Sequence, residues 1–167
     1  MARHLPSPLA ATALTALILH GAIFGFFYAW VCSTMWGLDT LPPLTAIEAM
    51  RAMNGSVRNA VFAPAFFATP FVSLAVAAWA WRSGRANAAR RFAAAGIVYL
   101  LGGLVLTMAV NVPMNEALAL VALPENTEAL RQIWEAYSGP WQVWNQIRTI
   151  FSGIALLLAG MGLLKLA

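Results

Sequence analysis

Long apolar segments dominate the chain, and four of them are long enough to cross a membrane. Residues 5–38, 59–81 and 92–115 contain no Asp, Glu, Lys or Arg, and residues 141–164 contain one charge, Arg148. An α-helix needs about 20 mostly apolar residues to cross the hydrocarbon core. The pattern therefore predicts four spanning helices, at about residues 9–35, 59–81, 92–115 and 141–164.

A cleaved signal peptide is the alternative explanation for the first apolar segment, because such peptides also begin with basic residues. Their apolar region is about 7–15 residues long. The segment here is longer, and no convincing small-residue cleavage site follows it. We therefore expect it to be retained as the first span.

The two longer connections have the composition of short surface helices. After Pro42 and Pro43, residues 47–56 alternate between apolar and polar positions at helical spacing. After Pro124 we expect a second short helix over residues 127–137. The predicted fold is an all-α membrane protein with a single domain over residues 1–167. It is a four-transmembrane-helix bundle with two short amphipathic or interfacial helices on the outward side.

The composition supports lipid as the solvent of this fold. Hydrophobic residues make up 61% of the chain and charged residues 10%, whereas about a quarter of the residues in a soluble domain are charged. The net charge is +4, but the basic residues lie at the ends of apolar segments rather than along one polar face. This distribution argues against a nucleic-acid partner.

The same charges predict the orientation. Arg3, Lys165 and the basic residues of segment 82–91 fall on one side, and all six carboxylates fall on the other. Because Lys and Arg accumulate in cytoplasmic loops, we expect an inner-membrane protein with cytoplasmic N and C termini. The two longer connections then face outward.

Polar residues inside the spans gather at their outward ends, where they indicate function. One face of the third span carries Thr107, Asn111 and Asn115, and one face of the fourth carries Trp141, Asn145, Arg148 and Ser152. The second span begins near Asn54, Arg58 and Asn59. We expect these stripes to form a polar site toward the outer face of the membrane.

Arg148 has two interpretations. It is separated from Lys165 by about 24 Å of helix, which puts it at or just inside the outer boundary of the hydrocarbon core. It either snorkels to the headgroups or turns into the bundle, and its polar neighbours favour the second interpretation. The aromatic residues beside it form an interfacial belt, a pocket lining, or both: Trp134, Tyr137, Trp141 and Trp144.

His20 is the ionisable residue near the middle of the first span, and such a residue is a functional candidate. A neutral histidine bonded to a neighbouring helix is the commoner role. No second His or Cys stands at metal-ligand spacing, so we expect no metal. We expect no other cofactor, because motifs for one are missing. Gly102–Gly103 and the Gly160–Gly162 step are expected to serve close helix packing.

Three blocks of sequence are similar to a known family. They are Arg58-Asn59-Ala60-Val61-Phe62 followed by Pro64-Ala65-Phe66-Phe67, then Asn111-Val112-Pro113-Met114-Asn115, then Trp141-x-x-Trp144-Asn145-x-Ile147-Arg148-Thr149. In order and spacing they resemble the small four-helix membrane proteins that include the fungal anthrone oxygenases. The resemblance implies oxidation of an anthrone to an anthraquinone by dioxygen, without flavin, haem or metal.

Roles for individual residues follow from this chemistry, which needs oxyanion donors, a base and flat apolar walls. The catalytic candidates are Arg148, Asn111, Asn145 and His20. The substrate-binding candidates are Arg58, Asn59, Asn115, Trp141, Trp144, Phe62 and Phe66. His20 is the candidate base, although helix rise puts it about 10–15 Å from the polar cluster. Glu116 is nearer, but is expected to face water.

Three functions remain open at this stage. The first is a cofactor-independent, anthrone oxygenase-like monooxygenase for a hydrophobic aromatic substrate, polyketide-like or quinol-like. The second is a module that binds or transports a lipophilic small molecule. The third is a structural accessory subunit without catalysis. The expected partners are a lipophilic small molecule and membrane lipid, and a homo-oligomer remains open.

Overall fold

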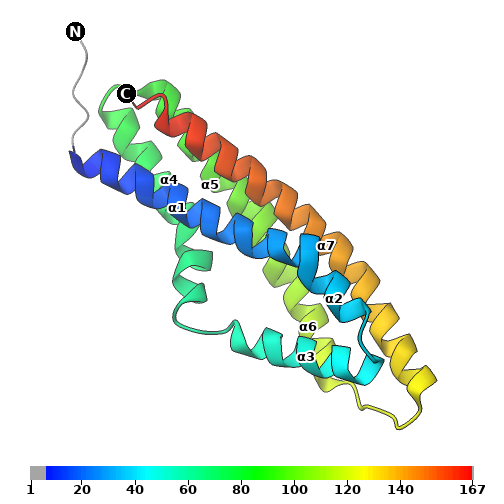
Figure 1. Ribbon diagram of the computed structural model, residues 1–167. Helices are drawn as coiled ribbons and strands as arrows, with labels where there is room; N and C mark the ends of the chain where they lie inside the picture. The colour runs from blue at the N-terminus through cyan, green and yellow to red at the C-terminus, as the bar shows by residue number, and fades with distance from the viewer. Residues whose placement is uncertain (1–6, 167) are drawn as a thin grey trace.

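The computed structural model describes residues 7–166, and every regular element in that range is a helix. Four helical segments are long and apolar enough to cross a membrane (Figure 1). They are Pro8–Asp39, Phe62–Arg82, Ala86–Leu120 and Thr127–Leu163. The predicted all-α membrane fold with four spans is confirmed.

The first span is one helical column built from three elements. It consists of α1 (Ser7–Ala29), a π-helical turn η1 (Trp30–Thr34) and α2 (Met35–Asp39). Two prolines then turn the chain. Pro43 occupies the first turn of α3 (Pro43–Ser56), where its missing N–H would have no helical partner in any case. The predicted amphipathic helix is therefore α3.

The second and third spans form a helical hairpin. α4 (Phe62–Arg82) and α5 (Ala86–Tyr99) are joined by a tight turn in which Gly84 adopts a positive φ of 75°. The third span continues through the π-helical segments η2 (Leu100–Val105) and η3 (Thr107–Asn111) into α6 (Val112–Leu120). Pro113 lies inside this continuous helical segment, two residues after the end of η3.

The fourth span differs from the prediction. A separate helix over residues 127–137 was expected, but α7 runs without a break from Thr127 to Leu163. Pro140 lies inside it. The helix stays continuous because the Asp39 carboxylate accepts hydrogen bonds from Trp134 and Ser138 before the proline and from Gln142 after it. These contacts tie the segments before and after Pro140 to the same carboxylate at the end of α2.

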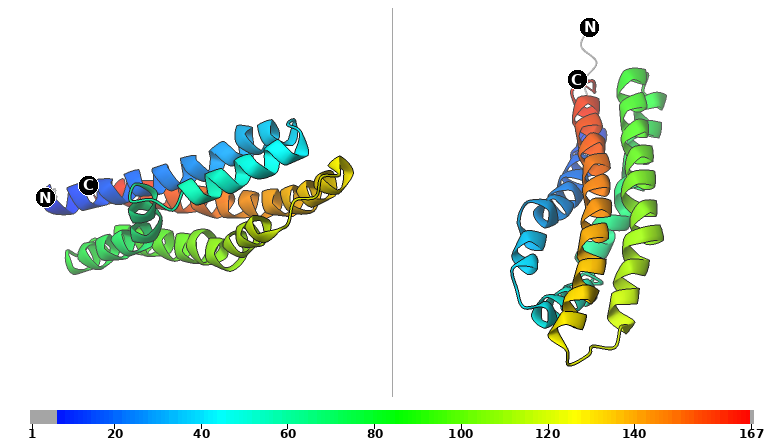
Figure 2. Two further views of the ribbon diagram at one scale, coloured as in Figure 1. Left: turned by 90° about the horizontal axis from the view of Figure 1, so that it is seen from below. Right: turned by 90° about the vertical axis from the view of Figure 1, so that its right-hand side faces the viewer.

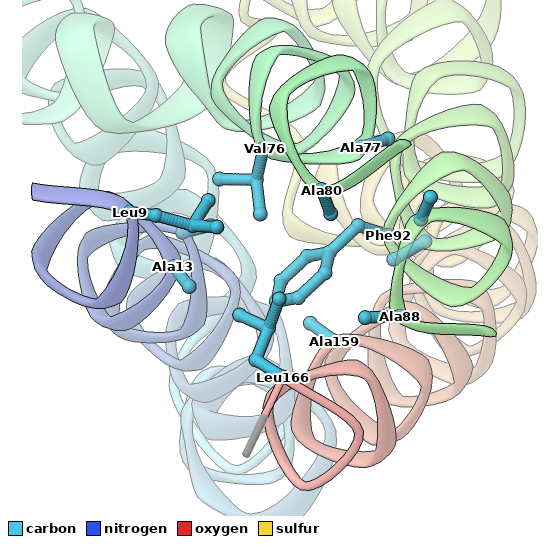
Figure 3. Packing of buried hydrophobic residues seen from close by; sticks show 12 residues of the cluster. Leu9, Ala13, Val76, Ala77, Ala80, Ala88, Phe92, Ala159 and Leu166 are labelled. Carbon is cyan, nitrogen blue, oxygen red and sulfur yellow. The ribbon is translucent and has the colours of Figure 1, made fainter. Parts of the chain in front are cut away.

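The spans pack as a closed ring in the order α1, α4, α5 and α7, with α7 also contacting α1. Figure 2 shows α7 running beside both the first and the third span. At one end of the bundle, alanines from the four helices surround the ring of Phe92 (Figure 3). α3 and the 121–126 loop lie at the other end, which we call the α3 end (Figure 1).

Small residues allow the third and fourth spans to approach closely, as the sequence predicted. A Cβ atom built on Gly102 would overlap the Cβ and Cγ atoms of Phe151 in α7. One built on Gly162 would lie 2.9 Å from the ring of Phe92. Gly160 differs, since its Cβ would meet only Leu17, at an ordinary 3.8 Å.

α1 begins and α7 ends at the same end of the bundle as the α4–α5 turn (Figure 1). This topology puts the basic 82–91 segment and Lys165 together, away from α3. Which side of the membrane they face stays a prediction, and Arg3, which also supports it, lies outside the described residues.

Replacing Gly102 with Ala is expected to weaken the bundle by about 1–3 kcal/mol, because the added methyl group must push α7 outward. The measurement is a thermal melt of the detergent-solubilised protein. Gly21→Ala is the matched control, since nothing lies within 4 Å of a Cβ at that position. If the two variants melt at the same temperature, close approach at Gly102 is not needed.

Candidate functional site

The polar stripes of the third and fourth spans face each other. Nη1 of Arg148 donates to Oγ1 of Thr107 at 3.3 Å, and Nε1 of Trp141 donates to Oδ1 of Asn115 at 2.9 Å. The two spans run in opposite directions, so each step of one turn along η3 and α6 matches one turn back along α7. The stripes predicted from helical spacing therefore form one ladder.

Arg148 is the centre of this ladder, and its side chain turns into the bundle. It is 5% exposed. Its Cζ atom lies 4.2 Å from the centre of the Phe27 ring and 5.1 Å from that of Trp141. Contacts of this kind hold a guanidinium between aromatic faces. The snorkelling interpretation is therefore wrong.

The hydrogen bonds of Arg148 leave some of the N–H donors of its guanidinium unused. Nε donates to Oδ1 of Asn145 at 2.9 Å, and Nη1 donates to Thr107. Nη2 donates to no described residue. Within residues 7–166 no carboxylate pairs with the guanidinium, since the ion pairs found there are exposed ones at Arg58 and Arg131. A buried charge without a partner costs several kcal/mol in a membrane, so the site is electrostatically suited to an anionic oxygen.

Two further polar groups in the ladder have no described partner. Both amide atoms of Asn111 are buried without a hydrogen bond, as is Oγ of Ser152. The contacts on either side place Asn111 between the Thr107 and Asn115 rungs, facing α7. Buried polar groups normally have partners, so Asn111 and Ser152 are the unsatisfied positions of the ladder.

A cavity of about 600 Å³ opens on the α3-end side of Arg148. Its walls come from α1, η1, the end of α3, the α3–α4 connection, α4, η3, α6 and α7. The apolar part is lined mainly by rings: Phe26, Phe27, Trp30, Phe62, Phe66, Phe67 and Trp141. The polar part contains Arg148, Thr107, Asn115, Asn54, Arg58, Asn59 and Glu116. The cavity is thus an aromatic slot with a cation in its wall.

Most of the predicted site residues meet at this cavity. Seven of them line it: Arg148, Asn115, Trp141, Arg58, Asn59, Phe62 and Phe66. Asn145 and Asn111 lie behind the lining in the ladder, fully buried or nearly so. Nδ2 of Asn145 donates to the backbone carbonyl of Phe27, so this residue orients Arg148 and ties α7 to α1.

Trp144 and His20 are the two candidates that the structure does not bring to the cavity. Trp144 is 37% exposed and contributes nothing to the lining. A step of three residues from Trp141 turns the side chain about 60° back around the helix, whereas a step of four to Asn145 turns it about 40° forward. Trp144 therefore faces away from the stripe.

His20 is buried against the second and third spans. Its Nε2 atom lies 2.8 Å from Oγ of Ser73, and its ring meets that of Tyr99 edge-on at 5.7 Å. This is the helix-bridging arrangement that the sequence left open beside a catalytic one. His20 is not part of the cavity wall.

Two residues at the mouth of the cavity also make contacts that stabilise the fold. Oδ1 of Asn59 accepts from the backbone N–H groups of Val61 and Phe62 and so begins α4. Arg58 pairs with Glu116 at 3.3 Å, and both side chains are more than half exposed. Glu116 was expected to face water, and it does, but it also lines the cavity mouth.

Sequence reasoning missed the contribution of the first span. Phe26, Phe27 and Trp30 line the cavity, but they lie in a segment of almost uninterrupted apolar residues with no polar stripe. Nothing in such a segment distinguishes the bundle-facing rings from the lipid-facing ones. Asn54 also lines the cavity, and the sequence indicated it only by its position near the start of the second span. In the structure its amide donates to the hydroxyl of Tyr137 at 3.5 Å.

No group of three or more His, Cys, Asp or Glu within residues 7–166 is arranged to hold a metal ion.

Comparison with known protein families gives a match over the central part of the chain. The sequence model described as anthrone oxygenase matches residues 56–158. No curated protein and no solved structure matches the chain significantly. The matched segment contains the whole polar ladder and the Arg58–Glu116 pair, but not His20 or the rings of the first span. Because the match covers more than half of the chain, the protein belongs to the anthrone oxygenase family.

Proposed function

We propose that this protein is a cofactor-independent membrane oxygenase that converts an activated methylene of a hydrophobic aromatic ketone to a carbonyl with dioxygen. The observation that carries the proposal is Arg148, a buried cation without a carboxylate partner in the wall of an aromatic cavity. Membership of the anthrone oxygenase family supports the same reaction class.

The cavity suits a flat, largely apolar substrate. Its volume of about 600 Å³ lies within the usual range for small-molecule sites. Phe62 and Phe66 are stacked with ring centres 5.3 Å apart and an interplanar angle of 20°, which makes a continuous flat wall. A tricyclic anthrone can lie against this wall with its carbonyl oxygen directed to Arg148.

The proposed chemistry begins with loss of a proton from the methylene group. The resulting carbanion is delocalised onto the ketone oxygen, and the guanidinium of Arg148 stabilises that oxyanion. Asn145 holds the guanidinium in place through its 2.9 Å contact with Nε. The electron-rich anion reacts with dioxygen to give a hydroperoxide, which loses water. In balance, the CH2 group and O2 become a carbonyl and H2O.

The reaction also needs a group that accepts the methylene proton. Glu116 is the one carboxylate among the described cavity residues, and it lies at the mouth in contact with Arg58. We propose that the proton leaves toward Glu116 and the water outside. His20 is held by Ser73 and stands outside the cavity, so it is not proposed as the base.

The absence of a buried base among the described cavity residues favours one competing function. A module that binds or carries a lipophilic anion would use the same cavity and the same arginine without turnover. Binding and product formation must therefore be measured separately.

The test uses the purified protein in lipid nanodiscs with 1,8-dihydroxyanthrone as substrate and labelled dioxygen. We expect anthraquinone to form faster than in empty nanodiscs, with one labelled oxygen in each product molecule and the other in water. A rate equal to that of empty nanodiscs overturns the proposal. Saturable anthrone binding without product would identify the binding module instead.

A further inference from the structure

A second apolar hollow adjoins the cavity on the side of α1 and α4. Its volume is about 570 Å³. Residues that line this groove and not the cavity include Ala22 and Ala29 of α1 and Ala65 of α4. The groove exists because these positions carry only a methyl group where neighbouring positions carry rings.

The groove and the cavity share one wall. Phe26, Trp30, Met53, Val57, Asn59 and Phe62 line both. The rings of Phe26 and Phe62 form the centre of this wall, with ring centres 4.7 Å apart. One layer of side chains therefore separates the two hollows.

The two hollows differ in chemistry. The cavity contains the charges of Arg148, Arg58 and Glu116, whereas the groove is lined by no charged residue. Two hydroxyl groups in the groove are already bonded to backbone carbonyls: Thr34 to Ala29 and Ser56 to Met53. The amide of Asn59, in the shared wall, is bonded to the backbone of residues 56, 61 and 62. The groove thus offers a ligand mainly apolar packing.

The groove is also elongated along the first span. Its lining extends from Ala22 to Thr34, which is about 18 Å of helix at 1.5 Å per residue. A hollow of this length and chemistry fits an aliphatic chain, and its wall leads to the cavity that holds the arginine.

We propose that the cavity and the groove form one site for an amphiphile, with a flat oxygen-bearing aromatic head at Arg148 and an aliphatic tail along α1 and α4. The preferred substrate class is then an aromatic head carrying a long alkyl or isoprenoid chain, and a tail-less anthrone occupies the head site alone. This inference rests on the proposed head site at Arg148, but it does not require turnover.

The experiment uses a naphthol with a dodecyl chain that ends in a photoreactive diazirine. After illumination in nanodiscs, mass spectrometry maps the labelled residues. We expect labelling concentrated in residues 22–34 and 61–65, and a severalfold loss when dodecyl-naphthol competes. Ala29→Phe fills the groove at a position that does not line the cavity, and should remove most of this labelling. Ala78→Phe, at an exposed position of α4 outside both hollows, is the control.

Arg148→Met separates the parts of the proposal. Loss of groove labelling in this variant, with labelling elsewhere on the lipid-facing surface unchanged, supports a joined site. Groove labelling that survives Arg148→Met shows that the groove takes lipid chains independently, and overturns the proposal. Labelling spread evenly over the lipid-facing helices also overturns it. If the protein does not turn over anthrone but groove labelling depends on Arg148, the oxygenase function is wrong and the joined site is still supported.

Discussion

Replacing Arg148 with Met is expected to leave the fold intact while reducing anthrone oxidation by about a hundredfold or more, the usual cost of removing an oxyanion donor. The side chain of Met can fill the space between Phe27 and Trp141. Exchanging a buried charge for an apolar group of similar size is often neutral or stabilising. The measurements are a thermal melt and the rate of quinone formation in the same nanodisc preparation.

Arg148→Lys extends this test to geometry. Lys keeps the charge, but a point charge cannot contact Asn145, Thr107 and an oxyanion in one plane. We therefore expect impaired turnover in this variant as well. Arg131→Met is the matched control, because Arg131 is an exposed arginine of the same helix, paired with Glu128 and Glu135.

Two outcomes would contradict the proposed role of Arg148. If Arg148→Met fails to fold while Arg131→Met folds, the arginine serves the structure of the bundle. If both Arg148 variants keep full stability and full activity, the oxyanion site lies elsewhere.

Replacing Asp39 with Ala is expected to lower the melting temperature by roughly 5–10 °C, the effect of losing about 2–3 kcal/mol in a domain of this size. The carboxylate accepts from Nε1 of Trp134 at 2.9 Å, Oγ of Ser138 at 2.7 Å and Nε2 of Gln142 at 2.9 Å. A carboxylate at the end of α2 opposes the helix dipole, so these bonds account for its presence there.

Asp39→Asn provides the graded comparison. The amide oxygen keeps two acceptor positions but loses the charge, so we expect a smaller decrease in melting temperature than for Ala. Glu48→Ala, an exposed carboxylate of α3, should melt like the wild type. Equal melting of Asp39→Ala and Glu48→Ala would show that the clamp across Pro140 contributes nothing measurable.

The loss of Asp39 also bears on the cavity. α2 leads directly into α3, and the C-terminal part of α3 supplies Met53 and Asn54 to the cavity wall. A second tie holds this end, since Arg51 donates to the backbone carbonyls of Leu118 and Val121 and so caps the C-terminal end of α6. Two residues therefore fix the part of the cavity wall that α3 supplies. Asp39 binds it to the fourth span, and Arg51 binds it to the third.

The sequence by itself determined the number of spans and the existence of the polar stripes. Charge is too costly in lipid to occur along a span by chance, so three uncharged segments and one segment with the single charge of Arg148 predicted all four helices. Helical periodicity then grouped Thr107, Asn111 and Asn115 on one face, and Trp141, Asn145 and Arg148 on another. Both inferences need only the local geometry of a helix.

Only the tertiary structure decided which of these residues share a cavity. Trp141 and Trp144 were both candidates because they belong to one aromatic cluster of the sequence. The packing of α7 against the third span brought Trp141 to Asn115 and left Trp144, which lies off the polar stripe, partly exposed. The rings of Phe26 and Phe27 carried no signal, because in an apolar segment the lipid-facing and bundle-facing residues have the same chemistry. His20 was a catalytic candidate by depth alone, until Ser73 from another span proved to be its partner.

The continuity of α7 was likewise outside the reach of local patterns. Pro140 normally marks a break, and the contacts that bridge it come from Asp39, about a hundred residues earlier in the chain. Contacts between residues so distant in sequence leave no periodic trace. The elements followed from local chemistry, whereas the site followed from which faces of those elements the packing brought together.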